Sequence, residues 1–305
     1  MPRLGHYLLA NNLRSSLATL IGVLLPWPGN AIAAVIVALV TLQSGVVPGL
    51  GLLAWAILPA VAATWKLPQA ALLYDISFLV CAFCWFFAAL LHKFRNWSRV
   101  LEAATVLGAI LVVSIYLLPL PIQNFLLGGL EHVLAQPIHQ IVQMDKEFFQ
   151  SFDSISPLLI GGLYMVIALI SIIYLMLARI WQFAIFSSQQ KHEFYHIRIH
   201  RILALAVALI VISTFIWRIE WLISLTSIVL LPFIFGGFSL LLYIFTSSLS
   251  GSKSTSSMYY SYFIPVIAAL ILLFFPKLVL LFMAGIGFID SWIDFRKLRI
   301  LSIRG

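Results

Sequence analysis

Charged residues are scarce in this chain. Asp, Glu, Lys and Arg together make up 9% of its 305 residues, hydrophobic residues make up 63%, and the mean hydropathy is +1.08. A soluble globular domain carries about a quarter charged residues and could not bury so much apolar surface. The composition therefore excludes a soluble protein and predicts an all-α, polytopic transmembrane helix bundle.

Acidic residues and cysteines are also few. Ten Asp and Glu stand against 18 Lys and Arg, which leaves a formal net charge of +8. The basic residues lie between apolar runs, so we interpret them as loop residues beside a lipid bilayer and expect no nucleic acid partner. Cys81 and Cys84 lie in one apolar run, where they predict small packing side chains rather than disulfides or a thiol carrier.

The chain contains no phosphate-binding loop of the form G-x-x-x-x-G-K-[ST]. A transport role would therefore need energy from a partner, such as an ATPase subunit, or from an ion gradient. We expect no cofactor and no enzymatic activity.

Apolar runs follow one another through the whole chain, which we expect to form a single membrane domain over 1–305. They cover 15–26, 29–43, 46–64, 68–91, 99–119, 157–178, 202–217, 221–246, 260–275 and 278–293. The first two runs are near the lower length limit for a span, so they are either two tilted spans or a re-entrant pair. The prediction is therefore about eight to ten spans.

The distribution of Lys and Arg predicts the orientation. With the N-terminus inside, the outer loops keep only Lys66, Lys146, Arg218 and Lys277 of the 18 basic residues. Basic residues favour the cytoplasmic side, so both termini are predicted to be cytoplasmic. The expected location is the bacterial inner (cytoplasmic) membrane.

Three connecting segments have distinct compositions. The segment 122–156 has apolar residues at three- and four-residue steps, which predicts an amphipathic outer segment, either a surface connector or a gating lid. The segment 179–201 predicts a basic inner loop. The Ser-rich segment 247–258 predicts a flexible inner linker.

His192-Glu193-Phe194-Tyr195-His196 has the form H-E-x-x-H, which on a helix brings two imidazoles and a carboxylate together, as in zinc hydrolases. The motif lies in the basic inner loop beside Lys191 and Arg198. A third ligand would have to come from a distant residue such as Asp290 or Asp294. A zinc metallohydrolase is therefore only a remote alternative, and we predict no metal site.

Asp75 is the most unusual single residue. With Tyr74 it lies two turns into the run 68–91, roughly 10 Å below the predicted outer edge. A carboxylate at that depth is costly unless it is paired, solvated or protonated. We therefore expect a polar cavity, a contact to a solute or ion, or a buried ion pair. Glu102, one turn inside the inner end of its helix, is a weaker candidate of the same kind.

The last apolar run closes with Asp290 and Asp294, which share one helical face. Because the C-terminal end of a helix disfavours negative charge, nearby cations must compensate these carboxylates. We predict an ion-pair cluster on the inner face, formed by Arg179, Glu193, Arg198, Asp290, Asp294 and Arg296.

Small residues at helical spacing predict close helix packing. Asn30, Ala34 and Ala38 are four residues apart in the second run, and Gly161-Gly162 and Gly236-Gly237 lie in later ones. Such residues let the backbones of neighbouring helices approach each other.

Several short stretches of the sequence are similar to those of a known protein family. They are Ala38–Gly45, Trp55–Ala60, Asn96–Leu101, Leu177–Gln182, Glu193-Phe194, Ile197–Ile199 and Asp290–Arg296. In these stretches the chain resembles the YybS-like family of bacterial predicted membrane proteins, over most of its length. It departs from the family at Ser187–Gln190, where relatives often carry a Pro-Gly turn. Glu193 and Arg198 belong to the family pattern, but the histidines beside them do not.

The resemblance implies a multi-pass membrane protein without an established activity. The family has a proposed likeness in fold to the substrate-binding subunits of energy-coupling-factor vitamin transporters, which by itself does not define a substrate. We therefore expect a solute-binding or transport-type membrane component that works with another membrane or ATPase subunit. The alternative is a non-catalytic membrane scaffold or assembly factor, whose working surface would be the basic inner face.

Overall fold

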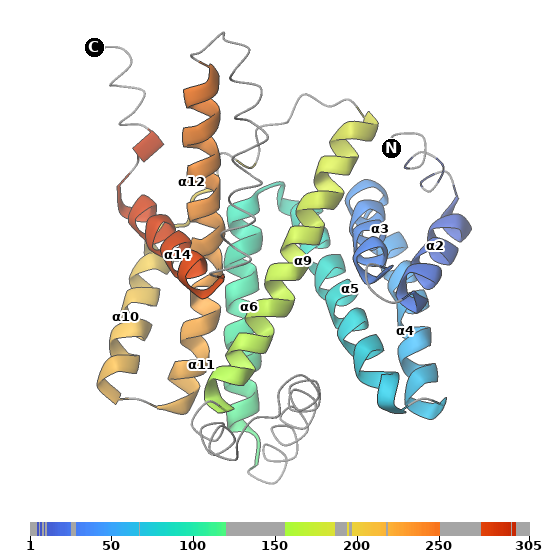
Figure 1. Cartoon of the computed structure of the whole chain (residues 1–305), viewed down its shortest axis with the longest axis horizontal. Coiled ribbons are helices and arrows are strands. Elements are labelled where there is room, and N and C mark those ends of the chain that lie inside the picture. The colour runs from blue at the N-terminus through green and yellow to red at the C-terminus, as the bar shows by residue number, and fades with distance from the viewer. Residues whose placement is uncertain are drawn as a thin grey trace. The chain divides into compact units, whose positions relative to one another are not determined.

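The computed structural model describes Gly5, Tyr7, Leu9 and residues 11–25, 29–66, 68–119, 156–186, 194, 197–217, 219–250, 276–293 and 295–296. All regular structure in these ranges is helical, which confirms the predicted all-α fold (Figure 1). The predicted outer segment 122–156 lies outside the described residues, except for Ser156. Within the range expected to be a single domain, the chain divides into two compact units. Unit 1 comprises Met1–Asn96 and Leu107–Lys191, and unit 2 comprises Trp97–Val106 and His192–Gly305.

Several helices in the described ranges suit a lipid bilayer. Four of them are long and apolar enough to cross a membrane, namely Tyr74–Phe94, Trp97–Leu117, Ile160–Phe186 and Glu220–Ile244. Shorter apolar helices cover Gly29–Ser44, Val46–Ala62, Arg201–Trp217 and Val279–Trp292. The chain is therefore a helical membrane protein. The predicted run 260–275 lies outside the described residues, so eight to ten spans stay a prediction.

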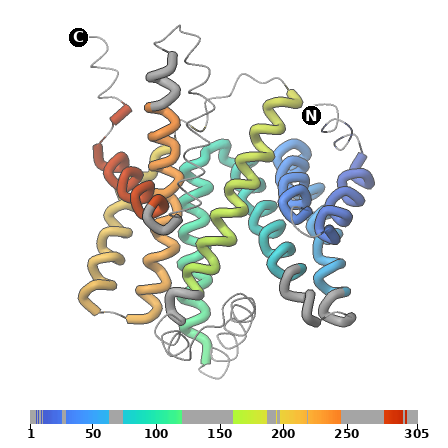
Figure 2. The backbone as a smooth tube through the Cα atoms, viewed as in Figure 1, coloured from blue at the N-terminus to red at the C-terminus, as the bar shows by residue number. Residues whose placement is uncertain are grey.

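Unit 1 is built around a buried helix. Its helices are α2 (Asn12–Leu24), α3 (Gly29–Ser44), α4 (Val46–Lys66), α5 (Pro68–Phe94), α9 (Ser156–Phe186) and the second half of α6 (Trp97–Leu117), whose order can be followed in Figure 2. α3 packs against α2, α4, α5 and α9. Its residues between Ala33 and Leu42 are almost all buried. A helix that is hydrophobic on every side suits such a central place.

α2 and α3 form a tight helical hairpin. The Asn11 side chain caps α2 by accepting a hydrogen bond of 3.0 Å from the backbone N–H of Leu13. A methyl group added at Gly29 would overlap the carbonyl oxygen of Gly22, so the helix ends touch backbone to backbone. The 13 residues of α2 measure only about 20 Å at the rise of an α-helix. This length favours the re-entrant alternative for the first two runs.

α9 is longer than the predicted run 157–178. Its 31 residues continue through Arg179 to Phe186, so the first part of the segment expected as a basic inner loop is helical. The physical reason is that apolar residues keep their helical spacing beyond Arg179, and Ile185 is buried. The helix measures about 46 Å, which exceeds the roughly 30 Å of a hydrocarbon core.

Unit 2 contains the first part of α6 with α10 (Arg201–Trp217), α11 (Glu220–Val229), α12 (Leu231–Ser250) and α14 (Pro276–Trp292). The predicted run 221–246 is divided between α11 and α12 at Leu230. Pro232 explains the break, because it has no N–H to donate to the carbonyl one turn earlier. α12 continues to Ser250, so the start of the predicted linker 247–258 is helical, and its remainder lies outside the described residues.

α12 and α14 cross at two glycines. A methyl group at Gly237 would overlap the carbonyl oxygen of Met283, and one at Gly287 would overlap that of Phe233. The close approach expected from Gly236-Gly237 is confirmed. The one expected from Gly161-Gly162 is not found at Gly162, where an added Cβ would meet nothing within 4 Å.

Candidate functional site

A polar cavity lies at one end of unit 1, where α3 and α5 end and α9 passes. Its volume is about 290 Å³. It is lined by Leu42 and Gln43 of α3, by Leu91 and His92 of α5 with Arg95 just beyond, and by Arg179 and Gln182 of α9. Apart from the two leucines, every lining side chain is polar, although the helices themselves are apolar. This end of the unit is the one predicted to be cytoplasmic.

Both α3 and α5 end at the cavity with a residue in the left-handed backbone conformation. Gly45 has a φ of 96° and donates its N–H to the Thr41 carbonyl at 3.1 Å. Arg95 has a φ of 49° and donates its N–H to the Leu91 carbonyl at 2.8 Å. A left-handed residue after the last turn commonly ends a helix, and glycine is the usual choice because it has no Cβ. For Arg95 this conformation costs roughly 1–2 kcal/mol.

Hydrogen bonds tie the three helices together around the cavity. Arg179 donates from Nη1 to Gln182 Oε1 at 2.7 Å, and Gln182 donates from Nε2 to Gln43 Oε1 at 2.9 Å. This chain links α9 to α3. On the other side, His92 Nδ1 lies 3.0 Å from the Leu42 carbonyl oxygen, which links α5 to α3. The cavity wall is therefore held by side chains that interact with each other.

Aromatic contact also orients Arg179. Its guanidinium lies 4.7 Å from the centre of the Phe183 ring, one helical turn further along α9. Arg179 and Gln182 are half-buried, while Arg95 and His92 are exposed. The site thus combines an anchored cation with one that is open to solvent, and it can bind a small polar ligand at the end of the helix bundle.

Asp75 and Tyr74 do not line this cavity. Both are half-buried near the start of α5. Asp75 precedes His92 by 17 positions on the same helix, which is about 25 Å at the rise of an α-helix. No described residue forms a hydrogen bond or an ion pair with Asp75. The two residues that the sequence favoured as solute contacts therefore lie far from the polar cavity.

Glu102 contacts the start of α10. Its Oε1 accepts a hydrogen bond of 3.3 Å from the backbone N–H of His200, the residue just before that helix. A carboxylate is favourable there, because the first N–H groups of a helix lack internal partners and carry partial positive charge. The observed contact of Glu102 is therefore with the protein backbone.

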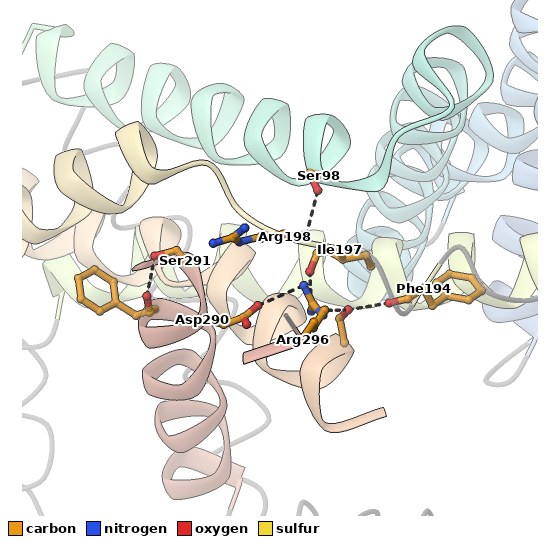
Figure 3. A network of polar contacts seen from close by, with 9 residues as sticks. Ser98, Phe194, Ile197, Arg198, Asp290, Ser291 and Arg296 are labelled. Carbon is orange, nitrogen blue, oxygen red and sulfur yellow. Dashed lines mark hydrogen bonds and ion pairs between the residues drawn. The ribbon is translucent and has the colours of Figure 1, made fainter. Parts of the chain in front are cut away.

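In unit 2, Arg296 and Asp290 of the predicted ion-pair cluster meet in the protein interior (Figure 3). Arg296 Nη1 lies 3.3 Å from Asp290 Oδ2, and the two side chains are 10% and 2% exposed. Arg296 Nη2 donates to the Ile197 carbonyl at 3.1 Å and to Ser239 Oγ at 3.2 Å. The guanidinium therefore joins the end of the chain's last described helix to α12 and to the extended segment 197–200.

That segment and Phe194 just before it are held by further polar and aromatic contacts. Ser239 Oγ donates to the Phe194 carbonyl at 2.7 Å, and the N–H of Arg198 donates to Ser98 Oγ at 3.2 Å (Figure 3). The Phe194 ring lies 5.0 Å from the ring of Trp97. Backbone groups outside regular structure need such partners when they are buried. The network is therefore a structural clamp on Phe194 and on 197–200.

Of the other members of the predicted cluster, Arg179 and Arg198 lie in the described part of the chain. Arg179 belongs to unit 1, where it lines the cavity. Glu193 and Asp294 lie outside the described residues. The backbone N–H of Arg198 joins the clamp through Ser98, as described above.

The H-E-x-x-H histidines, His192 and His196, also lie outside the described residues. In the part of the chain that the structure describes, no group of three or more His, Cys, Asp or Glu could hold a metal ion. Cys81 and Cys84 are free and fully buried, and Cys84 Sγ donates to the Ser171 carbonyl at 3.1 Å. These contacts are those of packing residues between α5 and α9.

Sequence reasoning missed four polar residues of the cavity, namely Gln43, His92, Arg95 and Gln182. Their position could have indicated a shared site, because each lies at or beyond the end of an apolar run on the predicted inner side. No motif connects them, since they come from three separate helices.

Comparison with known proteins was negative. No family model, no curated protein and no solved structure matches this chain. Its resemblance to the YybS-like family therefore stays an expectation from the sequence.

Proposed function

We propose that this chain is a solute-binding or transport-type component of the bacterial inner membrane, without enzymatic activity of its own. The observation that carries the proposal is the polar cavity of unit 1, with Arg95, Arg179 and His92 in its wall. The proposed partners are a small-molecule solute and another membrane or ATPase subunit, which would supply the energy for transport. The excess of basic residues in the predicted inner loops supports an orientation with both termini and the cavity on the cytoplasmic side.

The chemistry of the cavity supports a ligand site. Ionisable residues in membrane helices are expensive, and they usually face a water-filled cavity or a pathway for substrate. Gln43 and Gln182 are bonded to each other across two helices, which keeps the cavity wall in one arrangement. The volume of about 290 Å³ is near the lower end of the range for small-molecule sites, roughly 300–1,000 Å³. The solute is therefore small.

The scaffold alternative has less support. It requires the basic inner face to be a working surface, but Asp290 and Arg296 of that face are buried in contacts within unit 2. Glu102 likewise contacts the protein's own backbone. Asp290 and Arg296 are therefore not available to a separate protein.

Native mass spectrometry of the full chain, extracted gently from its own membrane, tests the proposal. We expect a reproducible small-molecule mass, with or without a protein partner, added to the 34.1 kDa of the chain. The variant Gln182→Trp fills the cavity and should lose that small-molecule mass. Leu177→Trp adds the same ring at a half-exposed position of α9 outside the cavity and should keep it.

Two results would overturn the proposal. One is a wild-type protein that is always found as a bare monomer or a plain homo-oligomer, which would favour the scaffold. The other is a small-molecule mass that is retained by Gln182→Trp, because the ligand would then lie elsewhere.

A further inference from the structure

His92 lines the cavity of unit 1 with one nitrogen of its ring already engaged by the protein. We propose that this ring selects the solute, by accepting through Nε2 a hydrogen bond from a hydroxyl or amide N–H group of the ligand. This inference rests on the proposed function, because it names the chemical class of ligand for the same site.

The carbonyl of Leu42 determines which ring nitrogen of His92 carries a proton. Leu42 lies in the last turn of α3, where carbonyl groups lack a partner within the helix. His92 Nδ1 lies 3.0 Å from this oxygen, which is hydrogen-bonding distance. Because a carbonyl oxygen can only accept a hydrogen bond, Nδ1 must carry the proton and donate it. The ring is thereby held in one tautomer.

The second nitrogen of the ring, Nε2, is left with a lone pair. In a neutral imidazole one nitrogen donates and the other accepts. Free imidazole titrates at about pH 6.5, so its neutral form prevails at higher pH. Among the described residues, the polar contact of the His92 side chain is the one that Nδ1 makes with Leu42. Nε2 of this exposed wall residue is therefore open to a ligand, and it is an acceptor.

The charged groups near His92 disfavour a cationic ligand. Arg95 and Arg179 line the cavity with it, and Lys93 is its neighbour on α5. In the described part of the chain, α3 brings no titratable side chain to the cavity, and every charged lining residue is basic. A ligand ammonium group would be repelled by the guanidinium of Arg95. The hydrogen-bond donor of the ligand therefore belongs to an uncharged group, such as a hydroxyl or an amide.

The cavity wall also offers hydrogen-bond donors. Gln43 Oε1 accepts a hydrogen bond of 2.9 Å from Gln182, which leaves the N–H₂ group of Gln43 to donate. Gln43 lines the cavity together with His92. A carboxamide carries an N–H donor beside a carbonyl acceptor, so its two groups match the acceptor of His92 and the donor of Gln43. Small carboxamides and hydroxyl compounds are therefore the solutes that suit this wall.

The same ring should make binding depend on pH. At acidic pH free imidazole takes up a second proton, which occupies the lone pair of Nε2 and turns this acceptor into a donor. The hydrogen bond from Nδ1 to the Leu42 carbonyl is compatible with both states of the ring. Binding through Nε2 should therefore be lost as the pH falls, while the cavity wall stays in place.

Two substitutions of His92 separate ligand binding from support of the wall. The amide of asparagine places an N–H group where Nδ1 stands, so His92→Asn keeps the bond to Leu42 and removes the acceptor. The longer glutamine places its amide oxygen near the position of Nε2, so His92→Gln keeps an acceptor and loses that bond. We expect His92→Gln to bind the ligand better than His92→Asn, although His92→Asn should have the higher thermal midpoint of unfolding. A purely structural histidine would give the opposite order of binding.

The test uses the full-length chain in a mild non-ionic detergent. Acetamide is the probe, and N,N-dimethylacetamide is the matched compound without an N–H donor. Saturation-transfer NMR measures the affinity of each compound, and nitrogen NMR of histidine-labelled protein observes the ring, whose signals are those missing in His92→Asn. At about pH 8 we expect Nδ1 to be protonated and acetamide to shift the signal of Nε2.

The loss of one hydrogen bond sets the size of the effect. Binding should weaken by about fivefold or more for N,N-dimethylacetamide, for acetamide with His92→Asn, and for acetamide at about pH 5.5. His200→Asn is the control, because His200 does not line the cavity and its observed contact, to Glu102, is made by its backbone N–H. The affinity of this variant for acetamide should stay within about twofold of the wild type.

Several results would overturn the inference. They are a proton on Nε2 of His92 at about pH 8, equal binding of the two compounds, or weaker binding by His92→Gln than by His92→Asn. The proposed function is tested separately by the co-purified mass. A solute that is lost in Gln182→Trp but retained in His92→Asn and at about pH 5.5 would overturn this inference alone and leave the proposed function standing.

Discussion

The contact between α12 and α14 predicts that alanine substitutions at two glycines of α14 will differ in their effect on stability. Gly285 and Gly287 are two residues apart on α14, so they face different sides. A Cβ at Gly285 would meet nothing within 4 Å, whereas a Cβ at Gly287 would lie 2.7 Å from the Gly237 nitrogen and 2.8 Å from the Phe233 carbonyl carbon. Gly287→Ala should therefore destabilise the protein relative to Gly285→Ala.

The magnitude follows from two terms. Ordinary contacts of a Cβ begin at 3.4 Å, so both contacts at Gly287 are too short by more than 0.5 Å, and the obstacles are backbone atoms that cannot rotate away. Overpacking of this kind costs about 1–3 kcal/mol. Replacing glycine by alanine inside a helix also gains about 1 kcal/mol. The gain applies to both variants, so it cancels in their difference, which should be about 1–3 kcal/mol.

Thermal unfolding in detergent, followed by tryptophan fluorescence, measures this difference. Gly285→Ala should unfold at or above the wild-type midpoint, and Gly287→Ala should unfold below Gly285→Ala by roughly 2–4 °C per kcal/mol. Equal midpoints, or a higher midpoint for Gly287→Ala, would refute the backbone contact between the two helices.

Three further predictions concern a buried ion pair, two buried cysteines and a helix cap. Arg296→Met should destabilise the protein by about 3–5 kcal/mol, because it removes a cation that lies 3.3 Å from the buried Asp290 carboxylate. Adding Asp290→Asn should recover part of that loss in the same assay. Cys81 and Cys84 should both resist a membrane-permeant maleimide in the folded protein and react after unfolding, as mass spectrometry can show, and labelling of the native protein would contradict their burial. Asn11→Ala should cost about 1 kcal/mol of stability, since the side chain caps α2, and an unchanged midpoint would argue against that cap.

Much of the fold follows from the sequence, because apolar runs in a membrane can only be helical. The starts and ends of α5, α6 and α10 lie close to the predicted runs. Pro232 favours the break at Leu230, but a proline alone does not predict a break, since Pro59 lies inside α4. The extent of α9 beyond Arg179 was missed, because a single charge was taken as the end of a helix. A long side chain can reach a polar partner while the helix continues.

The candidate site was harder to predict. Asp75 was favoured as a site residue because a charged residue within an apolar run is conspicuous in the linear sequence. The cavity instead gathers unremarkable polar residues from the ends of three helices, and their convergence depends on tertiary packing. The clamp on Phe194 and on 197–200 was partly predictable, because Asp290 needed a cation and Arg296 is six positions away. Its bonds to Ile197 and Ser239 depend on contacts between distant parts of the sequence.

The central place of α3 has a consequence for how the protein is made. During synthesis α3 emerges more than a hundred residues before α9, one of the helices that cover it. Until α9 is in the membrane, that side of α3 must be covered by lipid or by the insertion machinery. Unit 1 can therefore complete its packing only after α9 has been made, and a ribosome that stalls before α9 should leave a nascent chain that proteases of the membrane can recognise and remove.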